Sequence, residues 1–161
     1  MPDTLASDFL FDSELQAVDP KLRHAIDYWS ELRGQRLAPS RAELSPRAMK
    51  SFLPHVQIFD VLEGGKAYRP RLMGTAIVAQ INEDATGQLF DASSPRPVVH
   101  RVLRALGWIL ENRRPLRTFA MRTAIEGRDH ISHETVFLPL SSDGEAIDMM
   151  MLVGVFTPIA H

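Results

Sequence analysis

The sequence contains no cysteine among its 161 residues. This absence excludes disulfides, thiolate metal sites, iron–sulfur clusters and cysteine nucleophiles. The chain also lacks an excess of basic residues, since 18 Lys and Arg stand against 20 Asp and Glu, for a formal net charge of −2. No overall positive field draws it to nucleic acid, so we expect no nucleic-acid partner.

Long apolar runs and catalytic motifs are missing as well. No stretch approaches the run of about 20 apolar residues needed to cross a bilayer, so we expect no membrane insertion. Residues 1–18 are acidic and lack the basic start of a signal peptide, which favours a cytoplasmic protein. The chain has no Gly-rich phosphate loop, no Gly-x-Ser-x-Gly elbow and no carboxylate pair in an apolar setting. We therefore predict that it is not an enzyme.

The sequence does contain clear helix signals. Asp19 and Pro20 suit the N-cap and first turn of a helix that Gly34 ends. Ser45-Pro46 repeats this signal and predicts a short helix over 45–53, and Thr75 can cap another over 76–82. Three-residue and four-residue apolar spacing predicts the long helix over 98–112. Residues 1–18 are either a short docked helix or a frayed end.

Strand signals come in two groups. Alternating or continuous apolar residues predict strands over 56–62, 67–73, 116–125, 130–140 and 147–156. Short loops join the strands within each group, which indicates antiparallel pairing, and Asp143-Gly144 forms the last bend. We therefore predict an α+β fold with a five-stranded antiparallel sheet and helices on one face. Residues 1–53 would form an N-terminal helical extension, and 54–158 the sheet domain, within one structural unit.

Several short motifs follow one another in a fixed order between about residues 20 and 155. They include Tyr28-Trp29, Leu53-Pro54-His55, Tyr68–Ile77, Gly127–His130 and the turn Leu138–Gly144 before an apolar strand. In this order the chain resembles the PAS domains, and more narrowly a group of small bacterial single-PAS regulatory proteins. The resemblance implies a PAS-like sheet and a sensory or signalling role without catalysis. It implies no particular ligand.

A PAS-like sensor or adaptor would bind a small apolar ligand, a signalling protein or both, and we expect a homodimer. The expected ligand-binding residues are apolar or amphipathic side chains of the predicted sheet and helices, namely Tyr68, Leu72, Ile77, Leu103, Leu106, Met121, His133, Met149 and Met151. Alternation places Met149 and Met151 on one strand face. Methionine adapts to irregular ligands and partners, but plain core packing and a subunit contact stay open as alternatives.

Two tryptophans are the candidates for contacts with an unidentified signalling protein. Trp108 shares a helix face with Arg101 and Arg104 rather than with the leucines, which is typical of a protein contact surface. Trp29 lies in the first predicted helix, on its apolar side. That helix could instead cover Trp108 within the same chain, and the sequence leaves both interpretations open.

The histidines do not form a convincing cofactor site. His130 and His133 are three residues apart on a strand and point to opposite faces, which argues against a metal site. The resemblance implies that His100, on the long helix, would be the axial ligand of a haem, but it lies beside the apolar stripe. A flavin photocycle that needs cysteine is impossible, and stacking aromatics are few. We expect no cofactor.

Two other functions stay open at this point. A cone-shaped α+β enzyme, similar to an isomerase or dehydratase, would need a buried acid or base. Asp60, Asp148 and His133 are the strand residues that could serve. A purely structural interaction module with a filled core is the other alternative. The division of the strands around helices favours the PAS-like order over the cone.

Overall fold

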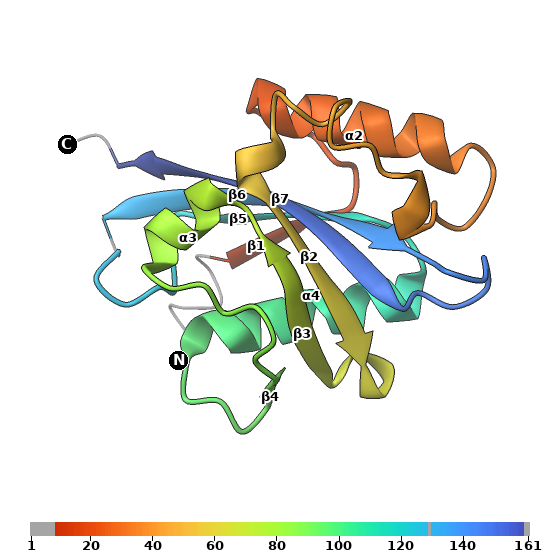
Figure 1. Ribbon diagram of the computed structural model, residues 1–161. Coiled ribbons are helices and arrows are strands. Elements are labelled where there is room, and N and C mark those ends of the chain that lie inside the picture. Colours follow the sequence, from red (N-terminus) through yellow and green to blue (C-terminus); the bar gives the residue numbers. More distant parts are fainter. Residues whose placement is uncertain (1–8, 129, 160–161) are drawn as a thin grey trace.

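A computed structural model describes residues 9–128 and 130–159. Its centre is one antiparallel sheet with the strand order β1-β5-β6-β7-β2-β3-β4 (Figure 1). The strands are β1 (Phe9–Asp12), β2 (Val56–Leu62), β3 (Ala67–Met73), β4 (Phe90–Asp91), β5 (Leu116–Ala120), β6 (Ile131–Leu140) and β7 (Met149–Pro158). The helices are α2 (Pro20–Arg33), α3 (Thr75–Ile81) and α4 (Pro97–Asn112). Single 3₁₀ turns lie at Arg41–Glu43, Leu53–His55 and Glu63–Gly65.

The α+β class and the antiparallel sheet are confirmed, but the prediction of five strands is wrong because the described residues form a sheet of seven. The additional strands, β1 and β4, lie at the two edges and are only 4 and 2 residues long. Strands this short carry too little alternation to be recognised. The helix predicted over 45–53 is a series of turns that ends in a 3₁₀ turn.

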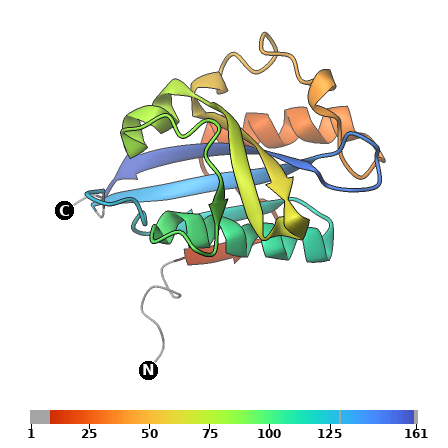
Figure 2. The ribbon, with the colours of Figure 1, turned by 60° about the horizontal axis from the view of Figure 1, so that its bottom comes forward.

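Helices cover both faces of the sheet, whereas the sequence predicted them on one face beside a separate extension. Helix α2 lies on one side and α4 on the other, with α3 at one end (Figures 1 and 2). Alternate residues of β6 show the two sides, because Val136 and Leu138 pack with the α2 core and Phe137 packs with the α4 core. The N-terminal extension is therefore the second cover of the sheet.

Local signals explain how α2 is held. The Asp19 side chain accepts a hydrogen bond from the Lys21 amide at 2.8 Å, and Gly34 ends the helix with φ +61°. Trp29 is buried, and its Nε1–H donates to the Pro139 carbonyl at 2.7 Å. This bond ties the middle of the helix to β6, across 110 residues of sequence.

The long helix α4 begins at a proline and ends at Arg113, whose φ of +56° turns the chain out of the helix. Its buried face consists of Val99, Ala105, Leu106 and Ile109. These residues pack in one core with Phe59, Phe137 and Leu152 of the sheet. Within the described part of the chain, no helix is long and apolar enough to cross a bilayer.

Candidate ligand-binding cavity

A cavity of about 560 Å³ lies between the sheet and the helices α3 and α4. Its volume falls within the range of about 300 to 1,000 Å³ that is usual for small-molecule sites. Strands β2, β3, β5, β6 and β7 contribute its floor, and residues of α3 and α4 contribute its roof. The β1 residue Phe9 closes part of its edge.

The strand register places polar residues in neighbouring rows on the floor. Thr118 pairs with Thr135, which pairs in turn with Gly154. The adjacent row contains His133 opposite Phe156, and the two rings stack with their centroids 4.2 Å apart. The Nε2 atom of His133 and the Thr135 hydroxyl are hydrogen-bonded at 2.7 Å. These side chains belong to three neighbouring strands, so the sheet itself fixes their positions.

Gly154 makes room for this arrangement. A Cβ atom at that position would lie 2.8 Å from His133 Nε2 and 3.1 Å from Thr135 Oγ1. Its carbonyl oxygen lies 3.1 Å from Nδ1 of His55, another residue of the cavity wall. The glycine is therefore a packing requirement for the histidine and threonine beside it.

Aromatic and aliphatic residues form the remaining wall. Tyr68 packs between Phe59 and Phe90, with ring centroids 4.7 and 5.2 Å away. Burial raises the pKa of the Tyr68 phenol well above its usual value, so the group stays neutral. Val99 and Val102 of α4 face the cavity from the opposite side. The interior is thus mainly apolar, with a group of polar side chains on the floor.

The charged groups of the wall come mainly from α4 and the loop before it. Arg96 forms an ion pair with Glu83 and lies 5.8 Å from the centre of the Phe90 ring. Arg101 lies 5.0 Å from the centre of the Phe9 ring and donates to the Arg122 carbonyl at 2.9 Å. Arg101 therefore connects the roof of the cavity to strand β1.

Burial and the nearby charge of Arg101 lower the pKa of His133 to about 4. The imidazole is consequently neutral at pH 7. A neutral ring has one donor and one acceptor nitrogen, which suits recognition of a polar ligand group. Among the described residues, no group of three His, Asp or Glu side chains could hold a metal ion.

The comparison with protein families agrees with this architecture. A family model described as PAS domain matches residues 18–156. The chain belongs to the PAS domain family. No curated protein and no solved structure matches it. Membership suggests a sensory or signalling module, and the cavity lies between the PAS sheet and its helices.

The PAS cavity brings together only some of the predicted ligand residues. Tyr68, Ile77 and His133 line it, and their role in binding stays a prediction. Leu103 and Leu106 pack in the α4 core without lining the cavity.

Four predicted ligand residues lie elsewhere. Leu72 and Met121 are exposed to 36% and 51%. Met149 and Met151 pack in the core beneath α2, on the opposite side of the sheet from the cavity. Alternation placed these two methionines on one face correctly, but that face is the one covered by α2.

The candidates for partner and haem contacts are also placed by the structure. Trp29 is 1% exposed on the buried face of α2, so it has no surface to offer a partner in this fold. Trp108 is half-buried against the α4 core and stays a candidate. His100 is exposed, with Nε2 at 2.7 Å from the Ser94 carbonyl, and lies outside the cavity lining. It is not placed to ligate a haem in this cavity.

The acid and base residues weighed for an enzyme do not converge. Asp60 accepts from Arg71 at 2.7 Å, and Asp148 is bonded to the Ser142 hydroxyl. Of the three candidates only His133 faces the cavity.

Sequence reasoning missed most polar residues of the cavity lining, among them Gln57, Arg101, Thr118 and Thr135. The signal for Thr118 was present, because it alternates with Leu116 and Ala120 on the inner face of β5.

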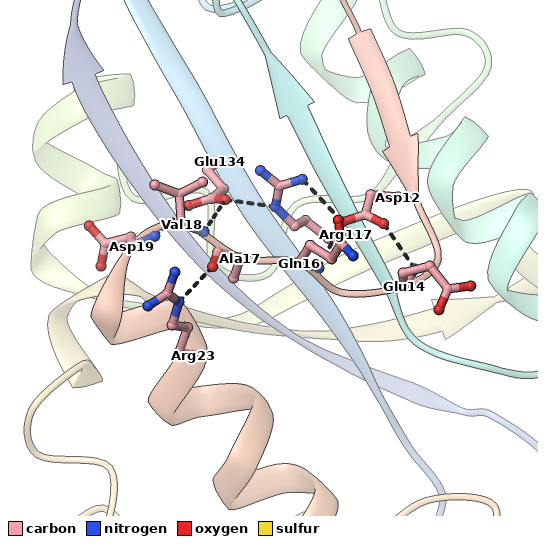
Figure 3. A network of polar contacts seen from close by, with 9 residues as sticks. All are labelled: Asp12, Glu14, Gln16, Ala17, Val18, Asp19, Arg23, Arg117 and Glu134. Carbon is pink, nitrogen blue, oxygen red and sulfur yellow. Dashed lines mark hydrogen bonds and ion pairs between the residues drawn. The ribbon is translucent and has the colours of Figure 1, made fainter.

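A second set of polar contacts anchors the N-terminal arm, residues 9–19, to the sheet (Figure 3). Glu134 is buried on the α2 side and accepts from the Val18 and Asp19 amides at 3.0 and 3.1 Å. It also pairs with Arg117 at 2.6 Å, and Arg117 reaches Asp12 at 3.1 Å. The arm is thus held by its backbone pairing to β5 and by this charged network.

Proposed function

We propose that this PAS domain is a non-catalytic sensor that binds a small amphipathic molecule in its cavity and passes its state to a signalling protein. The observation that carries the proposal is the cavity of about 560 Å³, mainly apolar and with a group of polar side chains on its floor. A filled core would make an adaptor without a ligand the better interpretation. The proposal includes that the protein is bacterial, cytoplasmic and a homodimer, as the sequence favours.

The N-terminal arm is the candidate route by which the signal leaves the cavity. Phe9 of β1 lines the cavity and lies beside both Arg101 and Arg104. The same strand leads through Asp12 to the network of Arg117 and Glu134 at the start of α2. A ligand that displaces Phe9 would shift the arm, provided that it binds the two arrangements with different affinity.

Binding of an apolar dye tests the proposal directly. N-phenyl-1-naphthylamine, which fluoresces in apolar surroundings, should bind the intact protein at one site per chain. Val102→Trp places an indole in the cavity and should weaken this binding about tenfold or more. Glu111→Trp adds the same ring to the exposed end of α4 and should leave binding unchanged.

Two outcomes would contradict the proposal. One is the absence of dye binding, and the other is equal binding by the Val102→Trp and Glu111→Trp variants. Native mass spectrometry of freshly purified protein would report a retained ligand and the number of subunits in one measurement. A strictly monomeric chain would contradict the homodimer while leaving the sensor function in place.

A further inference from the structure

Strand β1 is an edge of the sheet with one side open. It pairs with β5 through Phe9–Asp12, and no other strand of the described residues lies beyond it. Figure 2 shows β1, in red, at the margin of the sheet beside α4. Alternate backbone N–H and C=O groups of an edge strand point away from the sheet and can pair with another strand. An extended segment of a second protein can therefore add to the sheet at β1.

The two faces of β1 present different side chains to such a segment. Leu10 is 53% exposed and lies opposite Phe119 of β5 on one face. Phe9 and Phe11 alternate with it and lie on the α4 side, where the Arg104 guanidinium is 5.6 and 5.9 Å from the centres of their rings. An added strand would meet an apolar surface on one face and a cation on the other.

The cations around β1 carry unmatched charge. Arg104, Arg114 and Arg122 are exposed, and within the described part of the chain none of them is in an ion pair. Arg114 donates to the carbonyl of Ser13, just past the end of β1, at 3.2 Å. Arg122 comes two residues after the β5 residue that pairs with Phe9. The strand therefore has one arginine over its middle and one near each end.

The acidic residues nearby do not balance these arginines. Asp12 is matched by Arg117 at 3.1 Å, and Glu14 lies beyond the end of the strand. Glu111 is exposed on α4, about two helical turns after Arg104. Pairing of β1 with the same strand of a second copy would bring two sets of arginines to one edge, and like charges repel. The surplus of positive charge favours an acidic partner.

We infer that β1 is the docking site for an extended segment of the signalling protein, with acidic side chains on one face and apolar side chains on the other. The segment pairs with β1 as an additional strand. Its acidic side chains lie towards Arg104, and its apolar side chains contact Leu10 and Phe119. The inference rests on the proposed function, and it names the surface of the arm and the chemistry of the partner.

Fluorescence anisotropy of labelled peptides, titrated with the full chain, tests the chemistry. The probe is a short peptide of alternating glutamate and valine. One control has lysine in place of glutamate, and a second has the same composition with the glutamates in one block. We expect the alternating acidic peptide to bind about tenfold or more tightly than either control. Added salt should weaken this binding, because the arginines are exposed.

Variants and hydrogen exchange localise the binding. Arg104→Glu and Arg114→Glu should each weaken it about fivefold, and Arg104→Lys, which keeps the charge, should bind as the wild type does. Arg47→Glu is the matched control, because Arg47 is exposed and has no ion pair within the described residues, but lies in the turns of 46–52. Bound peptide should slow amide exchange within residues 9–12.

The other outcomes overturn the inference. Equal binding of the acidic and lysine peptides, or of the alternating and block peptides, would remove its chemistry. Binding without slower exchange in 9–12, or an equal loss in Arg47→Glu, would place the contact elsewhere. Exchange in 9–12 that slows with protein concentration alone would show that a second copy occupies the edge.

Two further measurements keep the test decisive. If Arg104→Glu loosens the arm, exchange over 9–19 becomes faster in the free protein, and Arg114→Glu then decides. Absence of peptide binding overturns the docking site, whereas the dye experiment decides the proposed ligand-binding function separately.

Discussion

His133 is a neutral histidine in a cavity wall, and this makes the stability of the domain depend on pH. Its pKa falls from 6.5 to about 4 on folding, through burial and the charge of Arg101. Between these values the imidazole binds a proton in the unfolded chain but not in the folded chain. The free energy of unfolding therefore decreases as pH falls from 6.5 towards 4. At pH 5 this loss amounts to about 2 kcal/mol.

Urea unfolding at pH 7.5 and pH 5, in the wild type and in His133→Gln, measures this effect. The wild type should lose about 2 kcal/mol more than the variant between the two values. The difference between the proteins removes contributions from carboxylates that titrate in both. Parallel losses in wild type and variant would show that the ring is protonated in the folded state.

Gly74 is a position where a single methyl group cannot be accommodated. A Cβ atom there would lie 2.3 Å from the Pro54 carbonyl oxygen, and the glycine amide donates to Val56 at 2.7 Å. We expect Gly74→Ala to destabilise the protein by about 1 to 3 kcal/mol, because backbone must move. Gly107, in the interior of α4, has nothing within 4 Å of such an atom.

The substitution Gly107→Ala is therefore the matched control for Gly74→Ala. It should raise the free energy of unfolding by about 0.5 to 1 kcal/mol, since alanine is the better helix former. Thermal unfolding of both variants measures the two effects in opposite directions. Stabilisation by Gly74→Ala would mean that the 53–55 turn and α3 are not packed as closely as described.

The arm that carries β1 depends on one buried carboxylate. Glu134 bonds the Val18 and Asp19 amides and the Arg117 guanidinium, which is itself 13% exposed. Glu134→Gln removes the charge and leaves Arg117 poorly compensated, so we expect a loss of about 3 kcal/mol. Hydrogen exchange should become faster over residues 9–19 and stay slow in the centre of β6 and β7.

The exposed ion pair between Arg36 and Glu43, at 2.7 Å, provides the control for Glu134→Gln. Glu43→Gln should change stability little, because solvent screens an exposed pair. Equal effects of the two substitutions would show that the Glu134 network contributes no more than a surface contact. Unchanged exchange over 9–19 in Glu134→Gln would show that strand pairing alone holds the arm.

Prediction from sequence succeeded where local periodicity determines structure. The long helix, predicted over 98–112, is Pro97–Asn112 in the structure. His133 lines the cavity, whereas His130 is exposed in the turn before β6, so strand alternation does not decide its orientation. Met149 and Met151 show where prediction from local alternation fails. Alternation assigns Met149 and Met151 to a common face, but both faces of β7 are apolar because helices cover both. Where α2 and α4 pack decides which face of β7 has the cavity. The alternation of apolar residues within the strand does not predict this.

Long-range pairing explains the other omissions. Strand β1 exists because Phe9–Asp12 pairs with β5, more than 100 residues away in sequence. The polar floor likewise depends on register, since Thr118 meets Thr135 only when β5 and β6 are aligned as they are. Neither contact can be predicted from residues that are close together in the sequence.

At the scale of the whole molecule, helix α2 and the segment after it, with Ala38, Met49 and Phe52, cover one side of the sheet. Leu22, Ala25 and Trp29 pack there against the buried residues of β6 and β7. Deleting residues 1–34 should therefore expose a large apolar surface and cause aggregation or loss of cooperative unfolding. Size-exclusion chromatography and thermal unfolding measure the outcome.

A chain that lacks only residues 1–8 is the control for this deletion, because it keeps every contact described for the arm and α2. It should remain as stable as the parent. If the deletion of 1–34 is equally soluble and stable, then α2 does not contribute to the core in solution.

The position of Trp29 gives the protein a built-in optical probe. Its two tryptophans lie on opposite sides of the sheet, Trp29 on the buried face of α2 and Trp108 on α4. The chain with Trp108→Phe therefore emits only from the α2 layer, and the chain with Trp29→Phe only from the α4 layer. Comparing their fluorescence during unfolding shows whether the two layers separate from the sheet together or one after the other.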